Sequence, residues 1–170
     1  MKIITLGDEL LRQKAEKVRD FNEDVANTAK QMLDILIRDK GIGVAGPQIG
    51  YMKRIFVTRV EGDIGRIFIN PSILETSIET VKFEEGCLSV PGIFANVIRS
   101  ESVKIQAWNE KGKPFTLEAS GILSRVIQHE YDHLEGVVFL DRVPEKKREK
   151  LIAKYEKAAS TAKAGGKRGA

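Results

Sequence analysis

Two histidines four residues apart are the feature of this sequence most able to do chemistry. His129 and His133 are the only histidines among 170 residues, and Glu130 directly follows the first. On an α-helix such residues lie one turn apart on the same face, so both imidazoles could bind one metal ion. The carboxylate of Glu130 could then reach a metal-bound water as a general acid/base. The pattern predicts a mononuclear metal hydrolase; the alternative is two histidines that align without a function.

A catalytic site of this kind usually has three protein ligands and one open position. Because there is no third histidine, the longer pattern H-E-x-x-H-x-x-G-x-x-H is excluded. Cys87, the only cysteine, is one candidate, since a thiolate is a strong metal ligand. Downstream acids are the other candidates and would make the protein a thermolysin-like zinc peptidase: Glu135, Asp141, Glu145 and Glu149.

The histidines must be positioned by a helix, which we predict over residues 120–134. Its apolar residues indicate that the helix is buried: Ile122, Leu123, Val126, Ile127 and Leu134. A buried helix that carries polar side chains needs partners for them, because unpaired buried polar groups cost stability. A metal ion would supply a partner for the histidines and Glu130. For Asp132, which faces elsewhere, we expect a structural role, either in an ion pair or in a contact between helices.

Three segments, in this order, resemble the motifs of the peptide deformylase family. Gly41–Gln48 resembles G-x-G-x-A-A-x-Q, with Gly46 where the family commonly has Ala. Glu85–Ser89 resembles E-G-C-L-S, and His129–His133 resembles H-E-x-D-H. The resemblance extends over about residues 3–145.

This resemblance implies that Cys87, His129 and His133 hold one divalent metal ion and that Glu130 transfers protons. The family uses Fe(II), and Zn, Ni or Co can substitute for it. The implied reaction removes the N-formyl group from the formyl-methionine of newly made polypeptides and releases formate.

The resemblance also implies a substrate site. The oxyanion donors would be the main-chain N–H of Leu88 and the side-chain amide of Gln48. Many family members carry a basic residue shortly after the second motif that meets the substrate's backbone or end; by counting, that position is Phe94 here, with Arg99 further on. Our candidates for binding the methionine side chain and the substrate main chain are Ile42, Gly43, Val44, Phe83, Gly86, Ile122 and Val126.

Length and composition predict a single catalytic domain over residues 1–159. Hydrophobic residues make up 42% and charged residues 31%, as in ordinary globular proteins. One cysteine rules out an internal disulfide, which fits a reducing compartment. With no apolar stretch long enough to span a bilayer and no signal peptide, we expect a cytoplasmic monomer without membrane contact.

The basic character of the chain is concentrated in residues 145–170. This segment holds nine Lys/Arg and three Glu, so it carries +6, whereas residues 1–144 carry −2. It indicates either a solvated helix with a flexible end or a surface that contacts an anionic partner such as the ribosome. A non-catalytic metal-binding domain with an RNA-contacting tail is therefore a further alternative to the hydrolase.

The remaining pattern predicts an α+β fold, with irregular antiparallel strands packed around a central metal-binding helix and a C-terminal helix. Further helices are expected from Asp8 to about Val18, from Asn22 to just before Gly41, and over about residues 144–158, followed by a disordered basic tail at 160–170. The expected strands are 54–60, 66–70, 72–76, 78–83, 103–108, 115–118 and 137–140.

Overall fold

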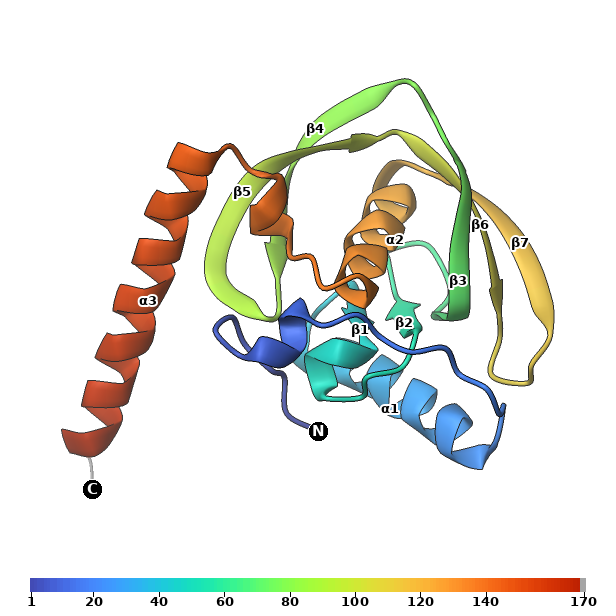
Figure 1. The fold of residues 1–170 in the computed structure, drawn as a ribbon, viewed down its shortest axis with the longest axis horizontal. Coiled ribbons are helices and arrows are strands. Elements are labelled where there is room, and N and C mark those ends of the chain that lie inside the picture. The colour runs from blue at the N-terminus through green and yellow to red at the C-terminus, as the bar shows by residue number, and fades with distance from the viewer. Residues whose placement is uncertain (169–170) are drawn as a thin grey trace.

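The computed structural model describes residues 1–168, with side chains described through residue 165. Helix α2 (Gly121–Leu134) lies at the centre, between two antiparallel sheets (Figure 1). The larger sheet has the order β1-β2-β3-β6-β7, and the smaller pairs β4 with β5. The strands are β1 (Gly43–Ala45), β2 (Ile55–Thr58), β3 (Arg66–Thr76), β4 (Thr80–Cys87), β5 (Val90–Ser100), β6 (Ser102–Trp108) and β7 (Pro114–Ser120). The predicted α+β class with a central helix is confirmed.

Helix α2 is buried on almost every side, as its sequence predicted. Ser120 precedes it in an extended conformation at the N-cap position. Ile127 and Leu134 are completely buried and pack in one core cluster with Phe56 and Phe68 of the larger sheet. The polar face of α2 turns toward the smaller sheet, and this orientation places the two histidines against β4.

Helix α1 (Glu23–Asp39) begins as predicted, because the side chain of Asn22 accepts a hydrogen bond from the Val25 N–H. It ends at Lys40, whose left-handed conformation (φ 54°) closes the helix one residue before the expected Gly41. The face that includes Met32 is buried. Ile37 is 58% exposed because the helical rotation carries it away from the sheet.

Two predicted strands form one strand in the structure. We expected a turn at Asn70–Pro71, but β3 continues through it from Arg66 to Thr76. Asn70 has a positive φ of 48°, and the register with β6 shifts between Ile69 and Ser72. The Asn70 side chain also bonds both main-chain groups of Val18. The residues that looked like a turn therefore form a bulge, which bends the strand without ending it.

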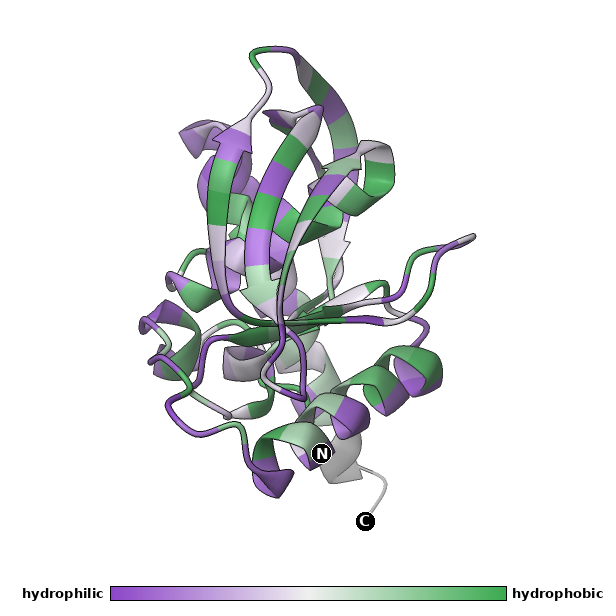
Figure 2. Ribbon diagram, turned by 90° about the vertical axis from the view of Figure 1, so that its right-hand side faces the viewer, coloured by the Kyte–Doolittle hydropathy of each residue, from purple (hydrophilic) through white to green (hydrophobic). Residues whose placement is uncertain are grey.

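Strand β5 was missed, because Pro91 and Gly92 suggested the end of a run. Beyond them the burial alternates strictly, as in a sheet with one buried face. Figure 2 shows alternating hydrophobic and hydrophilic bands of this kind along the strands.

The strand predicted at 137–140 is wrong: a 3-10 helix, η3 (Phe139–Arg142), occupies this position. The helix predicted from Asp8 to Val18 is reduced to a 3-10 turn, η1 (Glu9–Arg12), capped by Asp8.

Helix α3 (Glu145–Arg168) projects away from the body of the molecule (Figure 1). Residues 160–168, for which we predicted disorder, are helical here, and residues 169–170 lie outside the described part. Leu151, Ile152 and Tyr155 pack against the cluster formed by β5 and η3. The Tyr155 hydroxyl donates to the carbonyl of Leu6, 149 residues earlier. Among the described helices, none is long and apolar enough to cross a membrane.

Candidate metal centre

The structure brings Cys87 to the two histidines of α2. Ligand atoms of Cys87, His129 and His133 all lie within 4.8 Å of one another. The Cys87 Sγ is 3.4 Å from His133 Nε2. Cys87 is the last residue of β4, where the register with β5 shifts. That irregularity turns the thiol toward the helix.

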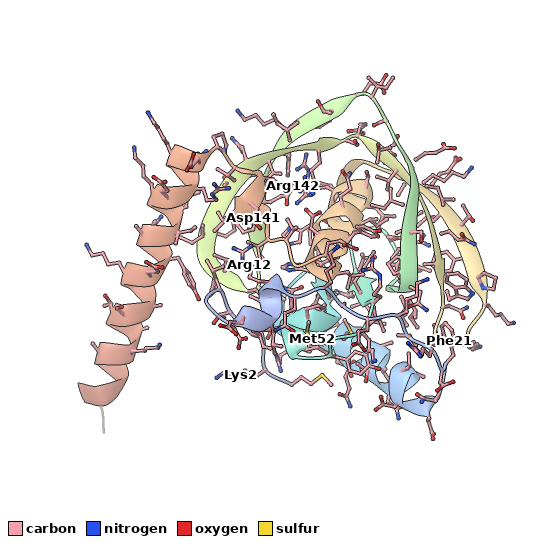
Figure 3. All side chains as sticks on the ribbon, in the orientation of Figure 1. Lys2, Arg12, Phe21, Met52, Asp141 and Arg142 are labelled. Atoms are coloured by element: carbon pink, nitrogen blue, oxygen red, sulfur yellow. The ribbon has the colours of Figure 1, made fainter. Side chains whose placement is uncertain are left out.

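None of the four downstream acids joins the two histidines, which argues against the peptidase alternative: Glu145 and Glu149 are exposed on α3, and the other two form ion pairs elsewhere. Glu135 pairs with Arg54 at 2.8 Å, beyond the end of α2. Asp141 pairs with Arg12 and accepts from the Val138 N–H. In Figure 3, Arg12 and Asp141 face each other between η1 and η3.

A thiolate and two imidazoles form a donor set that suits a divalent transition metal and leaves a coordination position open. One further observation fits a metal at this place. Glu130 Oε2 is a buried polar atom without a hydrogen-bond partner among the described residues. Such an atom is costly in an ordinary core, so its position here fits a site that a bound group completes.

A buried carboxylate, Glu85, fixes the orientation of His129. Its Oε1 lies 2.8 Å from His129 Nδ1, which leaves Nε2 free to bind a metal. Arg99 donates two hydrogen bonds to Glu85, at 2.6 and 2.9 Å, and Arg125 donates one at 2.6 Å. Sequence reasoning placed Glu85 in a motif but gave it no role. The only signal for this network was Arg99, which follows Ile93, Ala95 and Val97 at alternate positions and so falls on the buried face of β5.

Asp132, for which we expected a structural role, forms ion pairs. It accepts from Arg99 at 2.9 Å and from Arg142 at 2.6 and 2.7 Å. Arg142 is labelled in Figure 3 beside the helix α2. Arg99 is thus only 5% exposed and held by two carboxylates, so it does not present its charge to a substrate.

The buried charges shift the pKa values of this site. Burial acts to raise the pKa of Glu85, but hydrogen bonds from His129 and Arg99 outweigh it and hold the pKa at about 2. Burial lowers the pKa of His133 well below its usual range, which favours the neutral, metal-binding form. Burial also lowers that of His129, but hydrogen bonds with Cys87 and Glu85 raise the pKa above its ordinary value. Burial raises the pKa of Glu130 to about 7, near that of a poised acid/base.

Gln48 lies next to the thiol, in the short helix η2 (Gly46–Ile49). Its amide nitrogen is 3.5 Å from Cys87 Sγ and donates to Ser89 Oγ at 3.0 Å. Its carbonyl oxygen accepts from the Ala45 N–H at 2.8 Å, so the amide is held with its NH₂ toward the site. Leu88 lines the adjoining cavity. Both predicted oxyanion donors therefore belong to residues beside the three candidate ligands.

A cavity of about 480 Å³ opens beside these residues. Six of the seven predicted substrate-binding residues line it: Ile42, Gly43, Phe83, Gly86, Ile122 and Val126. The structure does not bring Val44 there, because alternation along β1 turns its side chain into the core. A Cβ on Gly43 would lie 2.6 Å from Glu130 Oε1 and 2.7 Å from Val126 Cγ1. A side chain at this position would therefore force Glu130 or Val126 to shift.

Comparison with known proteins agrees with the motifs. The family model for polypeptide deformylase matches residues 1–149. The peptide deformylase of Borreliella burgdorferi is 41% identical over 157 residues, covering 91% of this chain and 94% of that protein. That of Chromobacterium violaceum is 43% identical over 159 residues, covering 92% and 95%. A crystal structure of the Plasmodium falciparum peptide deformylase superposes with a TM-score of 0.88 at 37% identity, covering 96% and 98%.

Proposed function

Since the chain belongs to the polypeptide deformylase family, metal-dependent hydrolases that remove the N-formyl group from new polypeptides, we propose that Cys87, His129 and His133 hold its metal and that Glu130 is its acid/base. The observation that carries this assignment is the convergence of one thiol and two imidazoles beside a buried carboxylate with an unpartnered oxygen.

When bound, the metal supplies a Lewis acid and an activated water. Glu130 accepts the proton that the attacking water loses and later returns it to the leaving amine, which frees formate. Its pKa of about 7 suits both transfers. The amide of Gln48 and the main-chain N–H of Leu88 donate to the oxyanion that develops on the formyl oxygen.

The cavity accounts for recognition of formyl-methionine. Ile42, Ile122 and Val126 offer apolar surface for the methionine side chain. The substrate main chain passes Gly43 and Gly86, where the absence of a Cβ allows close approach. β1 is an edge strand of its sheet, so its free main-chain groups can pair with the substrate as an added strand.

For the metal itself we propose Fe(II), with Zn, Ni or Co as functional substitutes. The proposal is supported by the mixed thiolate and imidazole donor set, which several of these ions accept. Metal analysis after anaerobic purification should find iron at about one equivalent. Zinc at one equivalent, with activity that does not decline in air, would contradict it.

We further propose a cytoplasmic, monomeric enzyme that forms one catalytic domain over residues 1–159. The basic face of α3 is proposed to contact the ribosome, where formylated chains emerge. Lys150, Lys154 and Lys157 are exposed on this helix. Changing all three to Glu should weaken co-sedimentation with ribosomes and leave turnover of small peptides intact. Equal co-sedimentation would contradict the ribosome contact.

The decisive assay measures formate released from formyl-Met-Ala-Ser by metal-loaded protein. We expect stoichiometric formate and the free amine. A fully metal-loaded, folded sample that releases no formate would contradict the proposed active site.

A further inference from the structure

Phe94 is the most exposed large apolar side chain that lines the active-site cavity. It is 59% exposed, compared with 49% for Ile42, 50% for Phe83 and 47% for Ile122. Nothing in the proposed mechanism uses this ring. A large apolar surface at the mouth of a substrate cavity is costly to leave in water, so it requires an explanation.

The Phe94 ring is held in place by the strand opposite. Phe94 pairs with Gly86 in the β4–β5 register. A Cβ on Gly86 would lie only 2.7 Å from the ring, so the ring packs directly against the main chain of Gly86. Gly86 directly precedes Cys87. The ring is therefore a preorganised surface beside the proposed metal ligand.

Strands β4 and β5 line this wall of the cavity with Phe94 and one exposed carboxylate, Glu84, but with no exposed cation. Arg125 lines the cavity but is buried and bound to Glu85, and it also donates to the carbonyls of Val97 and Val81. Arg99 is buried as well. Lys40 lines the cavity from the end of α1, a different element.

We propose that Phe94 is a specificity-determining residue, which selects substrates with an apolar side chain at the second or third residue, behind formyl-methionine. The inference rests on the proposed function, because it assumes that the formyl group lies at the Cys87–His129–His133 site. Residues that follow the methionine must leave the cavity past its mouth, where the exposed face of the ring lies. Burying part of a leucine side chain against this face favours it over a polar residue of similar size by on the order of tenfold.

The test compares C-terminally amidated peptides, so that side chains alone differ. The series is formyl-Met-Ala-Leu against formyl-Met-Ala-Asn and formyl-Met-Ala-Asp, and the same substitutions at the second residue. We expect kcat/KM of the wild type to favour Leu over Asn about tenfold at one of the two positions, mainly through KM. In Phe94→Ala this ratio should fall to about two, and Phe94→Leu should keep a ratio of about five.

Ile98→Ala is the matched control. Ile98 lies on the same strand, is 61% exposed and does not line the cavity, so its removal should leave the Leu/Asn ratio at the wild-type value. An unchanged ratio in a folded Phe94→Ala variant, or the same fall in Ile98→Ala, would overturn the inference. If the wild type turns over all peptides equally, only this inference is overturned. If it releases formate from none, the proposed function is overturned instead.

Discussion

Replacing Glu85 with Gln tests the carboxylate that orients His129. The substitution keeps the shape of the side chain and an oxygen that can accept a hydrogen bond from His129, but it removes the negative charge. Arg99 would then keep only Asp132 as a charged partner, and Arg125 would remain buried with main-chain carbonyls alone. Uncompensated buried charge is strongly destabilising, so we expect losses in both folding stability and metal affinity.

The size of the effect follows from the pKa of Glu85. Its pKa is about 2 in the folded protein and 4.5 when unperturbed. One pKa unit corresponds to 1.36 kcal/mol, so the folded protein stabilises the ionised carboxylate by about 3 kcal/mol. Because the folded pKa is depressed, this contribution is fully present above about pH 4.5 and is lost as the pH falls toward 2. Metal affinity should fall by about 10- to 100-fold, as is typical when the partner of a ligating histidine is removed.

Urea unfolding of metal-free protein at pH 7, followed by the fluorescence of the single tryptophan Trp108, measures the first effect. Competition with a chelator measures the second. Glu79→Gln is the matched control, since it removes an exposed carboxylate. The stability difference between wild type and Glu85→Gln should shrink between pH 4.5 and 2. A loss of less than about 1 kcal/mol at pH 7, together with unchanged metal affinity, would refute the reasoning.

Three other perturbations address the site directly. Glu130→Gln should retain one equivalent of metal but lower kcat by at least about 10²-fold, because no group then transfers the proton; turnover within tenfold of wild type would remove Glu130 from the mechanism. Cys87→Ser should weaken metal binding measured by chelator competition, since a hydroxyl is a poor ligand for these ions, and full retention of metal and activity would exclude the thiolate as a ligand. Gly43→Ala should lower kcat/KM by at least about tenfold by displacing Glu130, with the protein still folded by circular dichroism, and an unchanged kcat/KM would show that the 2.6 Å approach is relieved without cost.

Parts of the molecule with a strong local pattern could be predicted from the sequence. Helix α2 was predictable because its apolar residues recur at the helical period and its polar residues fall into a recognisable motif. Strand β5 was not, because Pro91 and Gly92 at its start resemble a turn, and only pairing with β4 makes them part of a strand. The bulge at Asn70 was misread for the same reason, since tertiary contacts with Val18 stabilise it.

The site divides in the same way. The three candidate metal ligands and Glu130 have distinctive residue types and were found in the sequence. The network of Glu85, Arg99 and Asp132 joins β4 and β5 to the helix α2, which is distant in sequence, and charged residues usually indicate a solvated surface. Their burial could only be seen once β4, β5 and α2 were placed together.

The bond from Tyr155 to Leu6 has a consequence for how the protein is made. Leu151, Ile152 and Tyr155 complete the core cluster formed by β5 and η3. This cluster cannot be fully packed until these three residues have left the ribosome. Contacts between residues so distant in sequence slow folding, because the chain entropy must be lost before they form. Until α3 has emerged, the face of β5 that this helix covers in the folded protein stays exposed. This part of the protein therefore remains exposed to proteases and to misassociation until residues 151–155 have left the ribosome.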